Sequence, residues 1–408
     1  MPDFMPRPLQ AHPLFLCGFR PFFLFTAGWG VLAMAAWLAT LAGWLPMPDV
    51  TGGALQWHAH EMLYGFAMAS VAGFLLTAVP EFTGAPGYGG GTLFELSLLW
   101  LGARLAFLLS PWLGVWPAAV LNAALPLWLL WLLAPPIWRD PGRRHLSFLY
   151  ALAALAAADA GFFIALARGA AALPWLYAAN GVLMVLIVMT VSRVSMRIVN
   201  SGVDGDDDSG AAYLARPPRR NLATFAITLC TAAEFFLPGN AVAGWLALAA
   251  SAAMLNLLND WHVGMPLFRR WPLMLYAVYW LMALGFGAMG ASLLGAPWPV
   301  SAGRHLLMAG AISLAILSVM CIAGRSHAGH WPERRAWVPL AAATIILATL
   351  LRYAAGLPQA GTLAASLLAL SGLLWLAAFA LYLRYFWPIL ARARPDQAQG
   401  CAGPAGEA

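Results

Sequence analysis

Apolar runs of about 20 residues follow one another along nearly the whole chain, and they constrain its fold more than any other feature. Hydrophobic residues make up 62% of the 408 residues and charged residues only 9%, whereas a soluble domain carries about 25% charged residues. A soluble enzyme and a disordered chain are therefore excluded. A membrane β-barrel is excluded because its alternating segments of about ten residues are missing. The sequence predicts an all-α, polytopic membrane protein with about 12 transmembrane helices.

A polar segment at residues 197–220, with DGDDD at 204–208 and RPPRR at 216–220, divides the predicted helices into six plus six. We interpret it as a cytoplasmic linker loop within a single transmembrane domain over residues 1–408. The first six helices occupy 21–196, the last six occupy 221–390, and 391–408 form a flexible tail. The predicted spans are residues 21–45, 57–80, 92–110, 113–134, 147–168, 174–196, 221–238, 240–260, 272–295, 303–325, 336–356 and 363–388.

The distribution of arginine predicts the orientation, because basic loops resist translocation across the membrane. All 22 basic residues are arginine; eighteen fall on the side of the N-terminus, three on the opposite side, and Arg104 inside a span. Both termini are therefore predicted to be cytoplasmic. The net charge of +6 belongs to these loops and does not indicate a nucleic-acid partner. The four cysteines form no CxxC or CxxCH motif and indicate no disulfide framework.

Eight histidines in so apolar a chain suggest a haem or metal site. The topology places His58, His60 and His305 near the outer side, and His262, His327 and His330 near the inner side. A haem with two histidine ligands needs facing helices, so the outer candidates are His58 or His60 with His305. His305 and His327 are 22 residues apart on one predicted helix, or about 33 Å, and cannot share a metal. Each of these histidines also has a plainer interpretation, as a membrane-boundary or loop residue.

The sequence WHAHEM at residues 57–62 carries two of these histidines two residues apart. On a helix their imidazoles point about 200° apart, so only one faces the bundle. We favour His60 as the ligand, because Tyr64 and Gly65 follow one turn later and Gly65 leaves room for a flat ligand. His58 and Glu61 would then form a copper site or carry protons beside the ligand. The opposite choice of histidine stays open.

Buried charge is a second signal, because ionisable residues at membrane depth are costly and usually functional. Arg104 and Asp159 lie at similar depth in two predicted spans and could form a structural ion pair. Alternatively, Arg104 binds a haem propionate, since a guanidinium pairs with a carboxylate through two hydrogen bonds. Glu234, near the outer end of its span, either assists proton movement or reaches the interface.

Four segments together resemble the NnrS family of bacterial membrane proteins: LFLCGFRPFF at 14–23, WHAHEMLYGF at 57–66, GFLLTAVPEFTG at 73–84 and WLGARLAF at 100–107. The resemblance extends over essentially the whole chain. It implies a multi-pass protein of the bacterial cytoplasmic membrane that contains haem, with copper as a further cofactor, and that is linked to denitrification and nitrosative stress. By resemblance, His58, His60, His305 and His327 are haem or copper ligands, and His262 is a weaker candidate.

The chain departs from the family pattern at three places. SHAGH at 326–330 keeps His327 but has His330 where arginine is usual, Tyr276 replaces a histidine, and Glu81 replaces an asparagine. Tyr276 and His330 are therefore additional candidates beside the cofactors.

These features predict a protein that binds haem, of non-covalent b type, and handles nitric oxide or another small diatomic ligand. Redox turnover needs an electron donor, which the sequence does not identify, so both an enzyme and a binding protein stay open. One alternative is a secondary transporter with six plus six helices and a buried Arg/Asp site. Another is a membrane scaffold for respiratory complexes.

Overall fold

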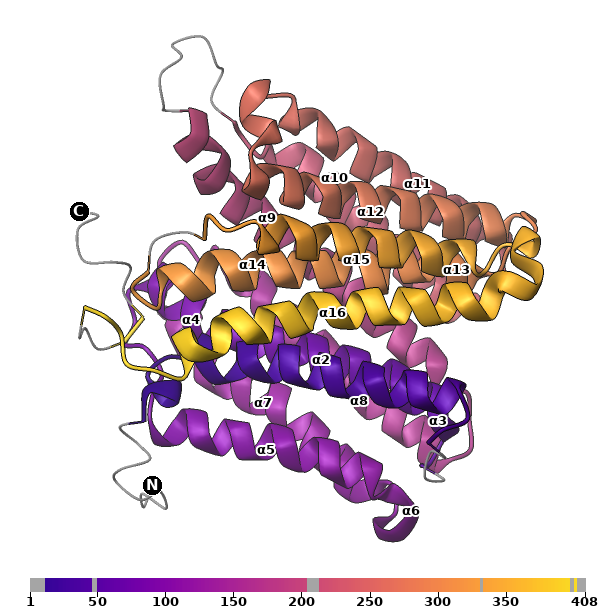
Figure 1. Ribbon diagram of the computed structural model, residues 1–408, viewed down its shortest axis with the longest axis horizontal. Coiled ribbons are helices and arrows are strands. Elements are labelled where there is room, and N and C mark those ends of the chain that lie inside the picture. Colours follow the sequence, from indigo (N-terminus) through magenta and orange to yellow (C-terminus); the bar gives the residue numbers. More distant parts are fainter. Residues whose placement is uncertain (1–11, 46–49, 204–212, 331–332, 397–399, 402–408) are drawn as a thin grey trace. The chain divides into compact units, whose positions relative to one another are not determined.

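A computed structural model of the protein describes residues 12–45, 50–203, 213–330, 333–396 and 400–401, and all regular elements within these ranges are helical (Figure 1). Eleven helical segments in this part of the chain are long and apolar enough to cross a membrane. The prediction of an all-α polytopic membrane protein is confirmed. The orientation, with both termini in the cytoplasm, stays a prediction.

The chain forms two compact units, which are described separately. Unit 1 consists of Met1–Ala179, Val319–Arg335 and Phe379–Ala408, and unit 2 of Asn180–Ser318 and Ala336–Ala378. The elements wholly within unit 1 are η1 (Pro13–Phe15), α2 (Phe19–Leu41), α3 (Gly53–His60), η2 (Glu61–Ala67), α4 (Met68–Thr83), α5 (Gly91–Leu108), α6 (Ser110–Leu113), α7 (Trp116–Arg139) and α8 (Leu146–Ala167).

Unit 2 contains its own set of elements, and three helices contribute residues to both units. Those within unit 2 are α10 (Pro217–Phe236), α11 (Ala241–Leu258), η3 (Asn259–Trp261), η4 (Met265–Phe268), α12 (Arg270–Leu293), α13 (Val300–His305), η5 (Leu306–Ile312), α15 (Trp337–Ala354) and η6 (Pro358–Leu363). The shared helices are α9 (Leu173–Val203), α14 (Ser313–Ser326) and α16 (Ala364–Leu390).

Helix pairs that are adjacent in sequence make many of the contacts within each unit. In unit 1, α7 packs on α5 and α8, and α2 packs on α4; in unit 2, α11 packs between α10 and α12 (Figure 1). The division into two compact units does not fall at the central polar segment, because unit 2 already begins at Asn180. The helix α9 continues through residues 197–203, which we expected to lie in the loop, and the DGDDD segment lies outside the described residues.

The span expected at residues 221–238 falls on α10, which is not among the eleven segments that are long and apolar enough to cross a membrane. This helix has 20 residues and begins with PPRRN, so two arginines occupy its first turn and shorten its apolar stretch. A twelfth crossing stays a prediction.

Two of the membrane-spanning segments share an unusual local structure. Gly53–Thr83 and Val300–Ser326 each begin with a short α-helix that ends in a histidine, His60 or His305. A seven-residue π-helix follows in each, η2 or η5, and then an α-helix. Such wide turns are rare and are frequently found at functional sites, because they rotate the side chains on either side relative to each other. These are also the two most buried spans, at 83% and 78%.

The contact between α12 and α13 depends on Gly303. A Cβ atom at this position would lie 2.6 Å from the backbone nitrogen of Met289 and 3.0 Å from the carbonyl oxygen of Gly285. Both are backbone atoms of α12, which a side-chain rotation cannot move. Gly303→Ala is therefore expected to lower the free energy of unfolding by about 1–3 kcal/mol, measured by thermal unfolding of the purified protein in detergent.

Gly102→Ala is the matched control for this prediction. Gly102 is also a helical glycine, but an added Cβ would make only an ordinary 3.7 Å contact with the side chain of Leu121. This substitution is expected to leave stability unchanged or to raise it by about 0.5–1 kcal/mol through helix propensity. Equal effects of the two substitutions would show that α12 and α13 do not approach this closely.

Described C-terminal residues of unit 1 contact the start of α2. Cys17 and Cys401 form a disulfide with a Cα–Cα distance of 5.7 Å. The sequence did not indicate this pairing, because the two cysteines are 384 residues apart and belong to no cysteine motif. The buried guanidinium of Arg20 donates to the carbonyl of Arg392 at 2.7 Å. Arg392 and Cys401 thus contact the start of α2, and a flexible tail at 391–408 stays a prediction. A disulfide is typical of an oxidising compartment, whereas the arginine distribution predicts that this end is cytoplasmic.

Candidate functional site

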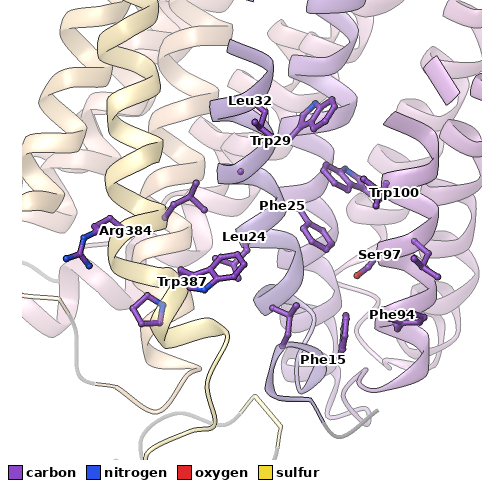
Figure 2. Close-up of a pocket in the computed structure, with 16 residues that line it drawn as sticks. Phe15, Leu24, Phe25, Trp29, Leu32, Phe94, Ser97, Trp100, Arg384 and Trp387 are labelled. Carbon is purple, nitrogen blue, oxygen red and sulfur yellow. The ribbon is translucent and has the colours of Figure 1, made fainter. Parts of the chain in front are cut away.

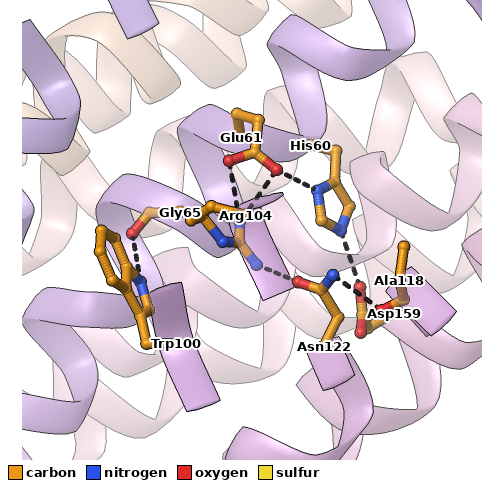
Figure 3. Close-up of polar contacts among 8 residues, drawn as sticks. All are labelled: His60, Glu61, Gly65, Trp100, Arg104, Ala118, Asn122 and Asp159. Atoms are coloured by element: carbon orange, nitrogen blue, oxygen red, sulfur yellow. Dashed lines mark hydrogen bonds and ion pairs between the residues drawn. The ribbon is translucent and has the colours of Figure 1, made fainter. Parts of the chain in front are cut away.

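A cluster of buried polar side chains lies inside unit 1 and brings together four membrane-spanning segments, Gly53–Thr83, α5, α7 and α8 (Figure 3). His60 ends α3 and Glu61 begins η2, while the other members come from α5, α7 and α8. Each member is at most 3% exposed. We call this the His60 cluster; its members are His60, Glu61, Arg104, Asn122 and Asp159.

The imidazole of His60 lies between two carboxylates. Its Nδ1 is 3.1 Å from Oε1 of Glu61, and its Nε2 is 2.9 Å from Oδ1 of Asp159 (Figure 3). Both ring nitrogens are therefore within hydrogen-bonding distance of an acidic oxygen. Of the two histidines of WHAHEM, His60 is the one that faces the interior of unit 1, since it is fully buried.

Arg104 binds Glu61 rather than Asp159. One terminal nitrogen of its guanidinium donates to both carboxylate oxygens of Glu61, at 3.0 Å each. The other donates to Oδ1 of Asn122, whose amide nitrogen donates to the carbonyl of Ala118 at 2.9 Å. The hydrogen bond from the Asn122 amide nitrogen to Ala118 orients the amide group, so the amide oxygen of Asn122 faces the guanidinium of Arg104. The ion pair expected between Arg104 and Asp159 is not formed, since Asp159 bonds to His60 instead.

The geometry determines how many protons the His60 cluster holds. A neutral imidazole has one N–H donor and one acceptor, so it cannot donate to Glu61 and Asp159 together. Either the imidazole is protonated between two carboxylates, or one carboxyl is protonated and the imidazole is neutral. With the positive charge of Arg104, both arrangements have zero net charge, as a buried site requires. The cluster thus holds one proton that three groups can share.

Asp159 has an additional acceptor that the cluster does not use. Its Oδ2 is buried and has no hydrogen-bond partner among the described residues. An unused carboxylate oxygen in an apolar interior is costly. This atom is a position at which Asp159 can hold or receive the shared proton.

Aromatic rings enclose the imidazole of His60. Tyr64 and Phe162 stack on it at centroid distances of 5.0 and 4.9 Å, and Phe107 and Phe163 approach edge-on at 4.9 and 5.0 Å. The hydroxyl of Tyr64 donates to the backbone carbonyl of Leu155 at 2.8 Å. Tyr64 is therefore one of the aromatic rings that enclose the imidazole of His60.

The space beside Gly65, expected to admit a flat ligand, is occupied by a tryptophan. A Cβ at Gly65 would lie 2.3 Å from the indole nitrogen of Trp29 and 2.8 Å from Oε2 of Glu61. Trp100 donates its indole N–H to the carbonyl of Gly65 at 3.1 Å (Figure 3). The two indoles therefore cover Glu61 on the side of α2 and α5.

The other outer histidines lie outside the His60 cluster. His58 is stacked on Trp37 at a centroid distance of 4.3 Å. His305, in unit 2, has its Nδ1 2.7 Å from the carbonyl oxygen of Ser301. Because a carbonyl oxygen can only accept, Nδ1 carries a proton and donates it, as the Nδ1–H of a metal-bound histidine commonly does. The neighbouring Arg304 forms an ion pair with Glu234, so Glu234 has a structural partner.

The inner candidates do not converge on a single site. His327 has Nδ1 2.7 Å from the carbonyl oxygen of Cys401 and Nε2 3.6 Å from Oε2 of Glu81. Burial and the charge of Arg325 lower the pKa of His330. The remaining two are His262, exposed after η3, and Tyr276, which packs against Trp261 and Trp280. Among the described residues, no three His, Cys, Asp or Glu side chains form a group that could hold a metal ion.

Reasoning from the sequence missed Asn122 and the phenylalanines around His60. The signal for Asn122 was available, because it is an amide inside an otherwise apolar helix that ends at Arg139. The phenylalanines carried no signal, since aromatic residues are common throughout these spans.

The fold and the His60 cluster together define a class of protein: a multi-pass helical membrane protein with a buried, ionisable, proton-holding site. Comparison with known families identifies it further. The model of the NnrS protein family matches residues 13–394, and the chain belongs to this family. It is thus a membrane protein of a family related to nitric oxide. No curated protein matched the chain.

Proposed function

We propose that this protein removes nitric oxide in the bacterial cytoplasmic membrane, relieving nitrosative stress during denitrification, and that the His60 cluster supplies the proton that this chemistry consumes. The observation that carries the proposal is the fully buried imidazole between Glu61 and Asp159, at 3.1 and 2.9 Å. Nitric oxide is a small uncharged gas that partitions into bilayers. Reduction of two molecules to nitrous oxide and water takes up two protons and two electrons, and the electrons would come from an external redox partner. Ionisable chains of this kind move protons in membrane proteins.

Haem is the cofactor that the family implies, and the described residues fit it unequally. Both nitrogens of His60 face carboxylates, so His60 does not fit an axial ligand. Arg104 likewise does not fit a propionate ligand, because Glu61 and Asn122 occupy both terminal nitrogens of its guanidinium. His305 fits, because its Nδ1–H donates to the backbone carbonyl of Ser301, an arrangement common for metal-bound histidines. When bound, haem would supply an iron that binds nitric oxide.

This assignment makes a prediction about haem content. His305→Ala is expected to remove most of the haem from the purified protein, whereas His60→Gln is expected to retain it. The absorption spectrum of the detergent-purified protein, oxidised and reduced, with and without nitric oxide, measures both. A Soret band that shifts on addition of nitric oxide supports the proposal for the wild-type protein.

The opposite pattern, with haem lost from His60→Gln and kept in His305→Ala, would contradict the assignment of roles. No haem absorbance in wild-type protein made with haem available would contradict the haem proposal itself. His58, His327 and a copper site stay predictions, as does the electron donor.

A proton-coupled secondary transporter is the second candidate, because a buried site holding one shareable proton would also suit such coupling. Proton uptake by membrane vesicles distinguishes the two candidates, since a transporter would show proton uptake that does not depend on nitric oxide.

A further inference from the structure

A cavity of about 920 Å³ lies in unit 1, between α2, α5 and the C-terminal part of α16 (Figure 2). Its wall is almost entirely apolar, and aromatic rings make up much of it, including Phe25, Trp29, Trp100 and Trp387. The volume is that of a small-molecule site. None of the residues that line it is a His, Cys or Met, so the cavity does not provide a ligand for haem iron.

Arg384 is the one charged residue among those that line the cavity. Its side chain is exposed, and no carboxylate among the described residues pairs with it. The hydroxyl of Ser97, the other conventional polar group of the wall, donates to the carbonyl of Leu93 at 2.6 Å within its own helix. The charge available to an occupant is therefore a single positive one.

The position of Arg384 along its span places this charge near the membrane surface. The span ends at Leu390, and six residues of helix correspond to about 9 Å. A long arginine side chain at this depth extends toward the headgroups. From there the cavity extends along α2, past Leu24 and Gly28 to Trp29 and Leu32 (Figure 2). It thus joins a cationic surface position to an apolar interior.

We propose that this cavity binds an anionic phospholipid, with an acyl chain against α2 and α5 and the phosphate on Arg384. An amphiphile with one negative headgroup matches a long apolar wall with one cation at its surface end. A neutral isoprenoid quinone would use the wall and leave Arg384 without a role. The arginine distribution predicts that this surface is cytoplasmic, where anionic lipids attract basic side chains.

The bound chain lies behind the indoles that cover the His60 cluster. Trp29 and Trp100 line the cavity, and the same two residues contact Gly65 beside Glu61. A lipid in this position therefore completes the apolar cover of a buried ion pair. This inference does not depend on the proposed function.

Native mass spectrometry of the full-length protein, purified and exchanged into matched mixed micelles, tests the proposal. The probes are phosphatidylglycerol and phosphatidylcholine with identical acyl chains. Wild-type protein is expected to bind phosphatidylglycerol about fivefold more tightly, the effect of about 1 kcal/mol for one arginine near the surface. Arg384→Gln is expected to abolish this preference. Arg139→Gln, which removes an exposed arginine at the end of α7, is expected to keep it.

Gly28→Leu tests the apolar part of the site. Gly28 lines the cavity, and an added Cβ has nothing within 4 Å, so a larger side chain here is expected to extend into the cavity. Both lipids are expected to bind about tenfold more weakly, as when about two methylene groups lose their burial. Gly28→Ala is expected to have a smaller effect. An unchanged melting temperature confirms that each variant folds.

Three results would overturn the proposal. One is a headgroup preference that survives Arg384→Gln, or that is lost equally in Arg139→Gln. Another is full lipid binding by a folded Gly28→Leu protein. The third is co-purification of an isoprenoid quinone that Gly28→Leu displaces while phospholipid binding is unaffected.

Discussion

Arg104→Leu is expected to lower the free energy of unfolding by about 3–5 kcal/mol, the usual cost of leaving one partner of a buried ion pair uncompensated. Glu61 is fully buried, and both of its carboxylate oxygens lie 3.0 Å from the Arg104 guanidinium. Without that guanidinium, two acidic groups share one imidazole in an apolar interior. Thermal unfolding of the purified protein in detergent measures the loss.

A double-mutant cycle separates this pairing from a general effect of losing a long side chain. Glu61→Gln removes the negative charge while keeping the shape of the side chain. The double variant is expected to be more stable than the sum of the single effects predicts, because the charge left unpaired by Arg104→Leu is then absent. Strict additivity would show that the two residues do not interact. Arg139→Gln, at an exposed position, is expected to change stability by no more than about 0.5 kcal/mol.

His60→Gln is expected to slow the removal of nitric oxide about 100-fold or more, the usual contribution of a positioned acid or base. A glutamine amide can hydrogen-bond to Glu61 and Asp159, so the cluster keeps a bridging side chain, but the amide cannot exchange a proton near neutral pH. Asp159→Asn is expected to cause a similar loss, because it removes the second carboxylate that shares the proton. A nitric oxide electrode with anaerobic membrane vesicles measures the rate per folded protein.

The control for this prediction is His12→Gln. His12 is an exposed histidine that caps η1 and lies outside the His60 cluster, and its substitution is expected to leave the rate unchanged. A wild-type rate for His60→Gln would remove the cluster from the chemistry. If His60→Gln and Asp159→Asn keep their haem but lose the rate, the loss lies in proton supply and not in cofactor binding.

The sequence predicted the components of the site better than their partners. Arg104 and Asp159 were recognised as buried charges, and Glu61 as a proton carrier, because charge is rare and costly in these spans. Their partners were not predicted: an Arg104–Asp159 ion pair was one of two alternatives, whereas Arg104 binds Glu61 and Asp159 binds His60. Similar depth along two helices limits which residues can meet. Which side of each helix faces the other depends on packing, and on the π-helix that begins at Glu61.

The sequence by itself determined that this is a polytopic helical membrane protein of the NnrS family, because long apolar runs can only be buried in lipid and the family motifs are local strings of residues. The tertiary structure decided which of His58 and His60 is buried, what surrounds it, and that Trp29 fills the space at Gly65. It also decided the pairing of Cys17 with Cys401. These outcomes depend on how helices rotate and pack against one another, and each of those choices is made by contacts between residues far apart in the chain.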